Sequence, residues 1–199
     1  MQLNKKQKDA LFATLDNRGY SCLKLLGKGG DGEVFLMKEK NSSKEYAVKC
    51  FPNSSEFNRL KKLSKCNHVV APYFYVEVKS DLFAYFMEKC SEIQTSFPSK
   101  KLLLGILEGI RELDEKGFEQ IDGFEGNILL KKGAEVVISD FSSFAAKNQN
   151  SVRNQIEKML EYVSSKRNIK KLISSIKQNN IKYDIPSIKK FISESEEIT

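Results

Sequence analysis

The stretch YSCLKLLGKGGDGEVFLMKEKNSSKEYAVKCF, Tyr20 to Phe51, decides the fold of the first half of the chain. It contains three runs rich in aromatic and other apolar residues, YSCLKLLG, EVFLMKE and EYAVKCF. A glycine cluster separates the first two runs, and an Asn-Ser-Ser cluster separates the second from the third. Short apolar runs bounded by turn residues are typical of strands. The stretch therefore predicts three strands joined by turns.

A helix and two further strands are predicted after this stretch. SSEFNRLKKLSK, residues 54–65, begins with serines that can cap a helix. Its apolar side chains recur at helical spacing, at Phe57, Leu60 and Leu63. HVVAPYFYVEV (68–78) and LFAYFME (82–88) are strand candidates. With a short N-terminal helix before Tyr20, the pattern predicts an antiparallel five-stranded sheet with one helix, residues 54–65, inserted in it.

The second half of the chain has mostly helical periodicity. KKLLLGILEGIRELDEKG, residues 100–117, carries one apolar stripe that ends at Gly117. Two brief strand candidates, 127–132 and 134–139, come next. Apolar residues then return at helical spacing in two segments, 156–163 and 169–176. The closing segment SIKKFISESEEIT is expected to fray.

These patterns predict an α+β fold with two lobes. The acidic segment that begins at Ser91 is the expected boundary, so the sheet lobe takes residues 1–90 and a shortened, mainly helical lobe takes 91–199. No run approaches the roughly 18 apolar residues of a membrane span, and the N-terminus lacks the apolar core of a secretory signal. We expect a soluble, cytoplasmic protein, although a secretion route without an apolar signal would leave no such trace.

Cysteine and histidine usage limits the chemistry that the chain can perform. The four cysteines are widely spread and form no C-x-x-C pair, and His68 is the single histidine. A zinc site is therefore disfavoured, and free thiols in a reducing compartment are expected. Any mechanism with a histidine base would depend on His68, for which we expect a structural role at a strand entrance.

The net charge of +7 is unevenly distributed. Residues 166–190, KRNIKKLISSIKQNNIKYDIPSIKK, are strongly basic, and Asp184 is their only acid. Such a segment suits contact with an acidic partner, while a solvated helix face explains it equally well. Binding of nucleic acid is disfavoured, because no aromatic interleaving or recognition motif accompanies the charge.

GKGGDGEV satisfies the pattern G-x-G-x-x-G-x-V with Gly27, Gly29, Gly32 and Val34. Glycines in a tight hairpin bring backbone amides close to phosphate oxygens, where a Cβ would intrude. The pattern precedes a strand rather than a helix, which disfavours dinucleotide binding. An ordinary glycine-rich hairpin between two strands is the alternative.

Lys49 follows at the end of the third strand candidate. Because strand residues alternate, Lys49 is expected to point away from the side of Val48 and Cys50 and into the space beneath the hairpin. Glu56 begins the following helix, where its carboxylate can hold the lysine ammonium near the α- and β-phosphates. The alternatives are a solvent-facing edge lysine and an acid that merely favours the helix dipole.

Five features have the order and spacing found in protein kinases: the glycine hairpin, AVK, the helix glutamate, FMEKC and the helix that leads to DEKG. The chain resembles that family over roughly residues 19–142. GKGGDGEVF is similar in particular to the loop of bacterial eukaryotic-like kinases. The resemblance implies a two-lobed kinase-like fold, with Met87 as gatekeeper and Glu88 to Cys90 as the hinge that contacts adenine. It implies a nucleotide-binding set of Gly27, Gly29, Gly30, Gly32, Val34, Ala47, Lys49, Met87, Glu88 and Cys90.

The resemblance also gives a role to EQIDGFEGNILL, residues 119–130. Asp122 matches the catalytic aspartate, and Asn127 matches the metal-binding asparagine. Asp140, in VVISDFSSF, matches the metal-binding aspartate of Asp-Phe-Gly. Two oxygen ligands suit Mg²⁺, which takes phosphate oxygens as further ligands, and Mn²⁺ is the alternative ion. Asp122 would accept the proton of the attacking hydroxyl, with ATP as the phosphate donor.

The sequence departs from the kinase pattern in the catalytic loop. Gln120 and Ile121 replace its His and Arg, so switching by a phosphorylated activation loop is not expected. Phe124 stands where Ser/Thr kinases usually carry a lysine that touches the γ-phosphate, and Ser142 replaces a glycine. Asp31 adds a negative charge at the tip of the phosphate loop, which is tolerable only if it points to solvent.

Only 57 residues follow Ser142, and they contain no Ala-Pro-Glu. The chain thus resembles minimal kinases that bacterial pathogens deliver into host cells as virulence effectors. The resemblance implies a Ser/Thr protein kinase that acts on a host protein, docked or activated through residues 166–190. A pseudokinase that binds a partner without transfer, and a small-molecule phosphotransferase, are the alternatives.

Overall fold

The computed structural model describes the chain in six stretches, residues 3–29, 32–51, 55–118, 123–139, 151–167 and 169–195, with the backbone alone at 29, 51, 55, 56 and 59. The chain forms two compact units. The first unit comprises Met1–Lys65 and Val70–Cys90, and the second comprises Cys66–Val69 and Ser91–Thr199. That these units act as the two lobes of a kinase stays a prediction.

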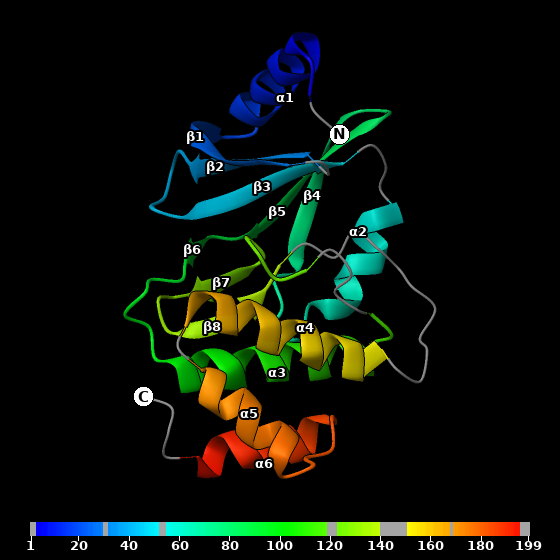
Figure 1. Ribbon diagram of the computed structural model, residues 1–199. Helices are drawn as coiled ribbons and strands as arrows, with labels where there is room; N and C mark the ends of the chain where they lie inside the picture. Colours follow the sequence, from blue (N-terminus) through cyan, green and yellow to red (C-terminus); the bar gives the residue numbers. More distant parts are fainter. Residues whose placement is uncertain are drawn as a thin grey trace. The chain divides into compact units, whose positions relative to one another are not determined.

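The first unit is built on a five-stranded sheet (Figure 1). Its strands are β1 (Tyr20–Gly29), β2 (Gly32–Glu39), β3 (Glu45–Phe51), β4 (Pro72–Lys79) and β5 (Leu82–Glu88). They lie in the order β1-β2-β3-β5-β4, and every neighbouring pair is antiparallel. The predicted five-stranded antiparallel sheet of an α+β fold is confirmed. The strand predicted to begin at residue 68 begins at Pro72, and residues 66–69 belong to the second unit.

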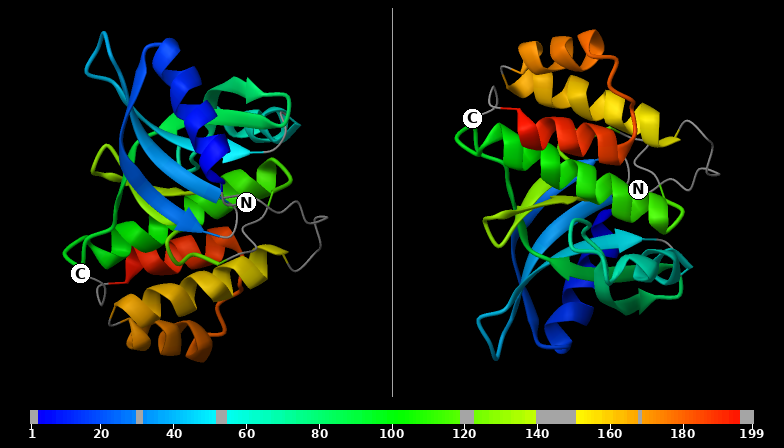
Figure 2. Two further views of the ribbon diagram at one scale, coloured as in Figure 1. Left: turned by 90° about the horizontal axis from the view of Figure 1, so that it is seen from above. Right: turned by 90° about the horizontal axis from the view of Figure 1, so that it is seen from below.

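Helix α1 (Lys5–Asn17) covers one face of this sheet (Figure 2). A capping box begins it: the Asn4 side chain accepts the Gln7 N–H, and the Gln7 side chain accepts the Asn4 N–H. The ring of Phe12 meets that of Phe35 edge-on, with 5.2 Å between centroids. The buried cluster under the helix contains Leu3, Leu11, Leu15, Phe35, Met37, Val48, Cys50, Val76, Leu82, Ala84 and Phe86.

The other face of the sheet carries α2 (Ser55–Leu60), which continues as a 3₁₀ turn over Lys61–Leu63. The N–H of Phe57 donates a buried hydrogen bond of 2.8 Å to the hydroxyl of Tyr85 on β5. The Phe57 ring also packs against Tyr75 of β4, with 4.7 Å between ring centroids. The helix predicted over 54–65 is therefore shorter than expected and closes in a tighter turn.

Helix α3 (Ser99–Glu115) forms the core of the second unit. The N–H of Gly117 donates to the carbonyl oxygen of Asp114 at 3.0 Å, and the φ of Gly117 is +76°, so the helix ends where the sequence predicts. The buried residues of α3 are Leu102, Leu103, Ile106, Leu107, Gly109, Ile110, Glu112 and Leu113.

A three-stranded sheet accompanies α3, in the order β6-β7-β8. Its strands are β6 (Cys90–Glu92), β7 (Ile128–Lys131) and β8 (Glu135–Ile138). The predicted strands 127–132 and 134–139 are confirmed as the antiparallel pair β7–β8, joined by a turn in which Gly133 has a φ of +72°. Strand β6 was not predicted from the sequence.

Two glycines let β8 lie close against α3. A Cβ on Gly105 would be 2.5 Å from the Cβ of Val136. A Cβ on Gly109 would be 2.6 Å from the Cδ1 of Ile138 and 2.9 Å from the carbonyl oxygen of His68. Because Gly105 and Gly109 are one helical turn apart, they form a shallow track on one face of α3.

Glu112 of α3 holds the segment before β4. Its side chain is 8% exposed, and its two carboxylate oxygens accept the N–H groups of Asn67 at 3.0 Å and of His68 at 2.8 Å. The carbonyl oxygen of His68 then accepts the N–H of Ile138 at 2.9 Å. The backbone of His68 thus joins this segment to α3 and to β8, while the structural role expected for the His68 side chain stays a prediction.

The remaining helices are α4 (Ser151–Lys166), α5 (Lys170–Gln178) and α6 (Ile185–Glu194), of which α4 and α6 pack along α3 (Figure 2). The expectation that the C-terminal segment frays is wrong for α6. The Asp184 side chain caps this helix by accepting the Ser187 N–H at 2.9 Å, and Ile188 and Ile192 are fully buried. Among the described residues, no helix is long and apolar enough to cross a membrane.

Candidate active site

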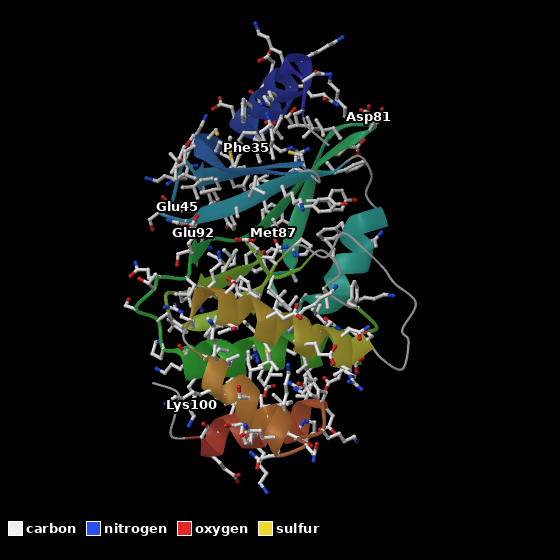
Figure 3. All side chains as sticks on the ribbon, in the orientation of Figure 1. Phe35, Glu45, Asp81, Met87, Glu92 and Lys100 are labelled. Atoms are coloured by element: carbon white, nitrogen blue, oxygen red, sulfur yellow. The ribbon has the colours of Figure 1, made fainter. Side chains whose placement is uncertain are left out.

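Four residues of the predicted nucleotide-binding set share one face of the five-stranded sheet. In the ladders, Val34 pairs with Lys49, and Ala47 pairs with Met87. Directly opposed residues in an antiparallel pair lie on the same face, and alternate residues of a strand return to it. This face is opposite the one that α1 covers, as the labelled side chains of Phe35 and Met87 illustrate (Figure 3).

The glycine-rich hairpin lies at one edge of this sheet. Its tip is narrow, since Lys28 pairs with Glu33 and Gly29 pairs with Gly32. Gly32 has a φ of +143°, which a residue with a Cβ rarely adopts. A Cβ on Gly27 would meet no atom within 4 Å, so the space above this residue is open. Gly30 and Asp31 lie outside the described residues.

Lys49 is 7% exposed and lies between Val34 of β2 and Tyr85 of β5. A buried ammonium is tolerated only with polar partners, so this lysine is more than a solvent-facing edge residue. Tyr85, which pairs with Lys49, accepts the N–H of Phe57. The first turn of α2, which contains Glu56, is thereby fixed to the strand beside the lysine. The Glu56 side chain lies outside the described part of the structure.

The predicted hinge segment is tied to neighbouring strands. The hydroxyl of Tyr73 on β4 donates to the Glu88 carboxylate at 3.0 Å. Burial and then this carboxylate raise the pKa of Tyr73 above its usual range. The Cys90 thiol donates to the carbonyl oxygen of Glu88 at 3.7 Å, and Lys89 pairs with Glu45 at 2.6 Å. The Glu88 side chain and its carbonyl oxygen thus both contact protein.

In the second unit, Asn127 and Ser139 lie side by side at the open end of the β7–β8 hairpin. The carbonyl oxygen of Asn127 accepts the N–H of Ser139 at 2.8 Å and its hydroxyl at 3.1 Å. The Asn127 side-chain amide donates to the Gly123 carbonyl oxygen at 3.2 Å, which fixes the direction of the amide. Asp140 follows Ser139 directly, although it lies outside the described residues together with Asp122, Gln120, Ile121 and Ser142.

The predicted metal site has one described member, Asn127. Its backbone carbonyl lies beside Ser139, the residue that precedes Asp140 in the sequence, and binding of a metal there stays a prediction. Mg²⁺ prefers oxygen donors and needs few of them from the protein. Within the described stretches, no group of three or more His, Cys, Asp and Glu residues could hold a metal by itself.

Phe124 is a core residue. It is 2% exposed, and its ring centroid is 6.2 Å from that of Tyr162 on α4. The neighbouring Glu125 pairs with Lys166, also on α4, at 2.8 Å. This pairing holds the pKa of Glu125 below its ordinary value. Helix α4 therefore contacts the residues that follow Asp122 in the sequence, through Phe124 and Glu125.

Three residues that hold backbone segments or strands of their own unit in place were not singled out from the sequence. They are Glu33 and Tyr85 in the first unit and Glu112 in the second. Glu112 carried a signal, since it follows Gly105 and Gly109 at helical spacing on the inward face of α3, where an acid needs a partner. Tyr85 carried a weaker one, as a hydroxyl within an apolar strand. Glu33 carried no signal, because its partner Lys8 is 25 positions away in the sequence.

Comparison with known proteins gives distant and partial matches, and no family model matches the chain. It is 28% identical to the serine/threonine-protein kinase nrc-2 of Neurospora crassa over 148 residues, which cover 62% of this chain and 24% of that kinase. It is 26% identical to the serine/threonine-protein kinase PLK2 of Mus musculus over 140 residues, which cover 59% of this chain and 20% of that kinase. The chain thus spans about a quarter or less of these relatives, and the matches support a kinase-like family.

Proposed function

We propose that the protein binds ATP with Mg²⁺ and transfers the γ-phosphate to a serine or threonine hydroxyl of another protein. The observation that carries the proposal is the shared sheet face of Val34, Ala47, Lys49 and Met87, with Lys49 buried in its centre. The distant similarity to serine/threonine kinases supports the same reaction and the same cofactors. Mn²⁺ is the alternative ion.

On this proposal, the first unit binds the nucleotide. The apolar side chains of Val34, Ala47 and Met87 contact the adenine ring, and the backbone from Glu88 to Cys90 accepts and donates hydrogen bonds to its edge. The amides of the glycine hairpin approach the phosphates. Lys49, oriented by Glu56, binds the α- and β-phosphate oxygens, where its charge offsets theirs.

The second unit supplies the residues of the chemical step. Asn127 and Asp140 would hold the divalent ion, which when bound neutralises charge on the phosphate oxygens. Asp122 orients the attacking hydroxyl and accepts its proton. Phe124 takes no part in contact with phosphate, because it is buried against α4. The rate is therefore expected to depend on positioning by Asp122 and Lys49, without the lysine that Ser/Thr kinases usually carry in this loop.

A protein substrate or an activating host protein would dock on the basic segment 166–190. Part of its charge is already neutralised within the second unit, since Lys166 pairs with Glu125, Lys182 with Asp184, and Lys189 with Glu108. The exposed lysines that remain for a partner are Lys170, Lys171, Lys177 and Lys190. A role as a bacterial effector in the host cytosol would fit such a minimal kinase.

A pseudokinase that binds a partner without phosphoryl transfer is the second candidate. The burial of Phe124 favours it, because this position cannot supply a cation to the γ-phosphate. A small-molecule phosphotransferase would use the same site, and its phosphorylated product would be small rather than a protein.

We expect Mg·ATP to raise the melting temperature of the protein in a saturable way, because a ligand that binds only the native state stabilises it. At a hundredfold excess over the dissociation constant the gain is about 2.7 kcal/mol. Differential scanning fluorimetry with ATP and Mg²⁺, with each alone, and with Mn²⁺ tests this. A melting temperature unchanged by Mg·ATP at millimolar concentration would contradict the proposed kinase and favour the pseudokinase.

A further inference from the structure

The glycine hairpin contains a buried carboxylate that the proposed reaction does not use. Glu33 follows Gly32 at the start of β2, and its side chain is 1% exposed. Because Val34 and Lys49 pair on one face of the sheet, Glu33 points to the other, toward α1. There it lies near Cys50, whose thiol pKa is raised to about 12 by burial and, less strongly, by the Glu33 charge.

The partner of Glu33 comes from α1. The Nζ of Lys8 donates to the Oε1 of Glu33 at 2.8 Å, and the side chain of Lys8 is 34% exposed. Lys28, on the hairpin itself, is farther away, with 4.0 Å between its Nζ and the same oxygen. The Oε2 of Glu33 has no hydrogen-bond partner among the described residues. The ion pair with Lys8 is therefore the main contact that compensates the desolvation of this carboxylate.

We infer that Lys8 is a positioning residue for the glycine hairpin, and that it acts through Glu33. The inference rests on the proposed function, because it assumes that the hairpin binds the phosphates of ATP. The hairpin is at the edge of the sheet, and Gly29 and Gly32 are the last pair before its tip. Pinning Glu33, next to Gly32, orders the hairpin beside its tip before the ligand arrives, so that binding loses less conformational entropy.

The contact between Lys8 and Glu33 is an ion pair at 2.8 Å, so its loss would leave a buried charge without its cation as well as remove packing. A buried carboxylate that loses its cation must find another one or move toward water. The nearest other cation is Lys28, on the opposite strand of the same hairpin. Loss of Lys8 is thus expected to draw Glu33 and Lys28 together and to twist the tip, rather than merely to loosen α1.

A second ion pair of α1, between Asp16 and Lys40, provides a matched control. Lys40 pairs with Asp16 of α1, with 2.6 Å between Nζ and Oδ1, and both side chains are exposed. This pair also joins α1 to the sheet, but Lys40 follows the far end of β2. Lys40→Met therefore reports what loss of one α1 ion pair does when the glycine hairpin is not involved.

The test compares Lys8→Met, Lys8→Arg and Lys40→Met in the full-length chain by titration with ATP and Mg²⁺. We expect Lys8→Met to raise the dissociation constant and the KM for ATP about tenfold, with kcat unchanged, and Lys8→Arg to restore both. Lys40→Met should stay within about twofold of the wild type. Equal affinities in Lys8→Met and Lys40→Met, with a wild type that binds ATP, would overturn the inference and leave the proposed function standing.

A second readout needs no nucleotide. Amide hydrogen exchange in residues 27–34 should be faster in Lys8→Met than in Lys40→Met, at equal melting temperatures. If Lys8→Met fails to fold, Lys8→Gln in the same two measurements takes its place. Unchanged hydrogen exchange in the hairpin of Lys8→Met would overturn the inference, whether or not the wild type binds ATP. Failure of the wild type to bind ATP would by itself refute only the proposed function.

Discussion

Replacement of Lys49 by methionine is expected to lower the rate of phosphate transfer from ATP by at least about 100-fold, the usual effect of removing one charged group that stabilises the transferring phosphate. Lys49 is buried in the middle of the sheet face that carries Val34, Ala47 and Met87. Methionine keeps most of its volume and should preserve the fold. The measurement is the initial rate of ³²P incorporation into a protein acceptor, together with the melting temperature of the variant.

The control for this variant is Lys38→Met. Lys38 belongs to the neighbouring strand β2, where it is exposed and pairs in register with Glu45. Its loss removes the same charge from the same sheet without touching the proposed phosphate site, so activity should change less than twofold. Transfer by Lys49→Met at the rate of Lys38→Met would show that the buried lysine has a structural role only.

The largest effect on stability is expected for Gly109→Val. A Cβ at this position would lie 2.9 Å from the carbonyl oxygen of His68, and that oxygen already accepts the N–H of Ile138. The backbone there cannot retreat without breaking this hydrogen bond or those that Glu112 accepts. Overpacking of a tight core typically costs 1–3 kcal/mol, so we expect a loss of about 3 kcal/mol in the free energy of unfolding.

Urea denaturation followed by circular dichroism measures this loss. Lys101→Val, at an exposed position of the same helix, gives the cost of valine in α3 alone, about 0.5 kcal/mol. Equal losses in the two variants would mean that α3 and β8 can move apart freely, and the close approach at Gly105 and Gly109 would then contribute nothing to stability.

The five strands could be predicted because their signal is local. Each run in Tyr20–Phe51 and its two later counterparts is bounded by residues that favour turns. The sequence-based predictions fail where contacts with residues distant in the sequence decide the local structure. The segment before β4 does not extend that strand, because Glu112 accepts the N–H groups of Asn67 and His68, and Val69 forms an isolated bridge with Ile138. The segment from Ile185 to Glu194 does not fray, because Ile188 and Ile192 are buried in the second unit and the Asp184 side chain caps its start.

The candidate site shows the same division. The resemblance to kinases grouped Val34, Ala47, Lys49 and Met87 as nucleotide-binding residues, but only the observed strand register places them on one face of the sheet. The residues that hold the site in place could not be predicted from the sequence. Lys8 and Glu33 are 25 positions apart, and Phe57 and Tyr85 are 28 apart, so no local pattern links them. Phe124 was recognised as a departure, but its burial against Tyr162 needed the structure.

The most direct test of the proposed phosphotransferase is transfer of labelled phosphate from ATP, by the wild type and by Asp140→Asn, into proteins of a eukaryotic lysate. The substitution keeps the size of the side chain and removes the charge that would bind the ion. The proposal predicts at least one labelled protein band with the wild type that is absent with Asp140→Asn, at equal stability of the two proteins. Bands of equal intensity with both proteins, or none with either, would contradict it.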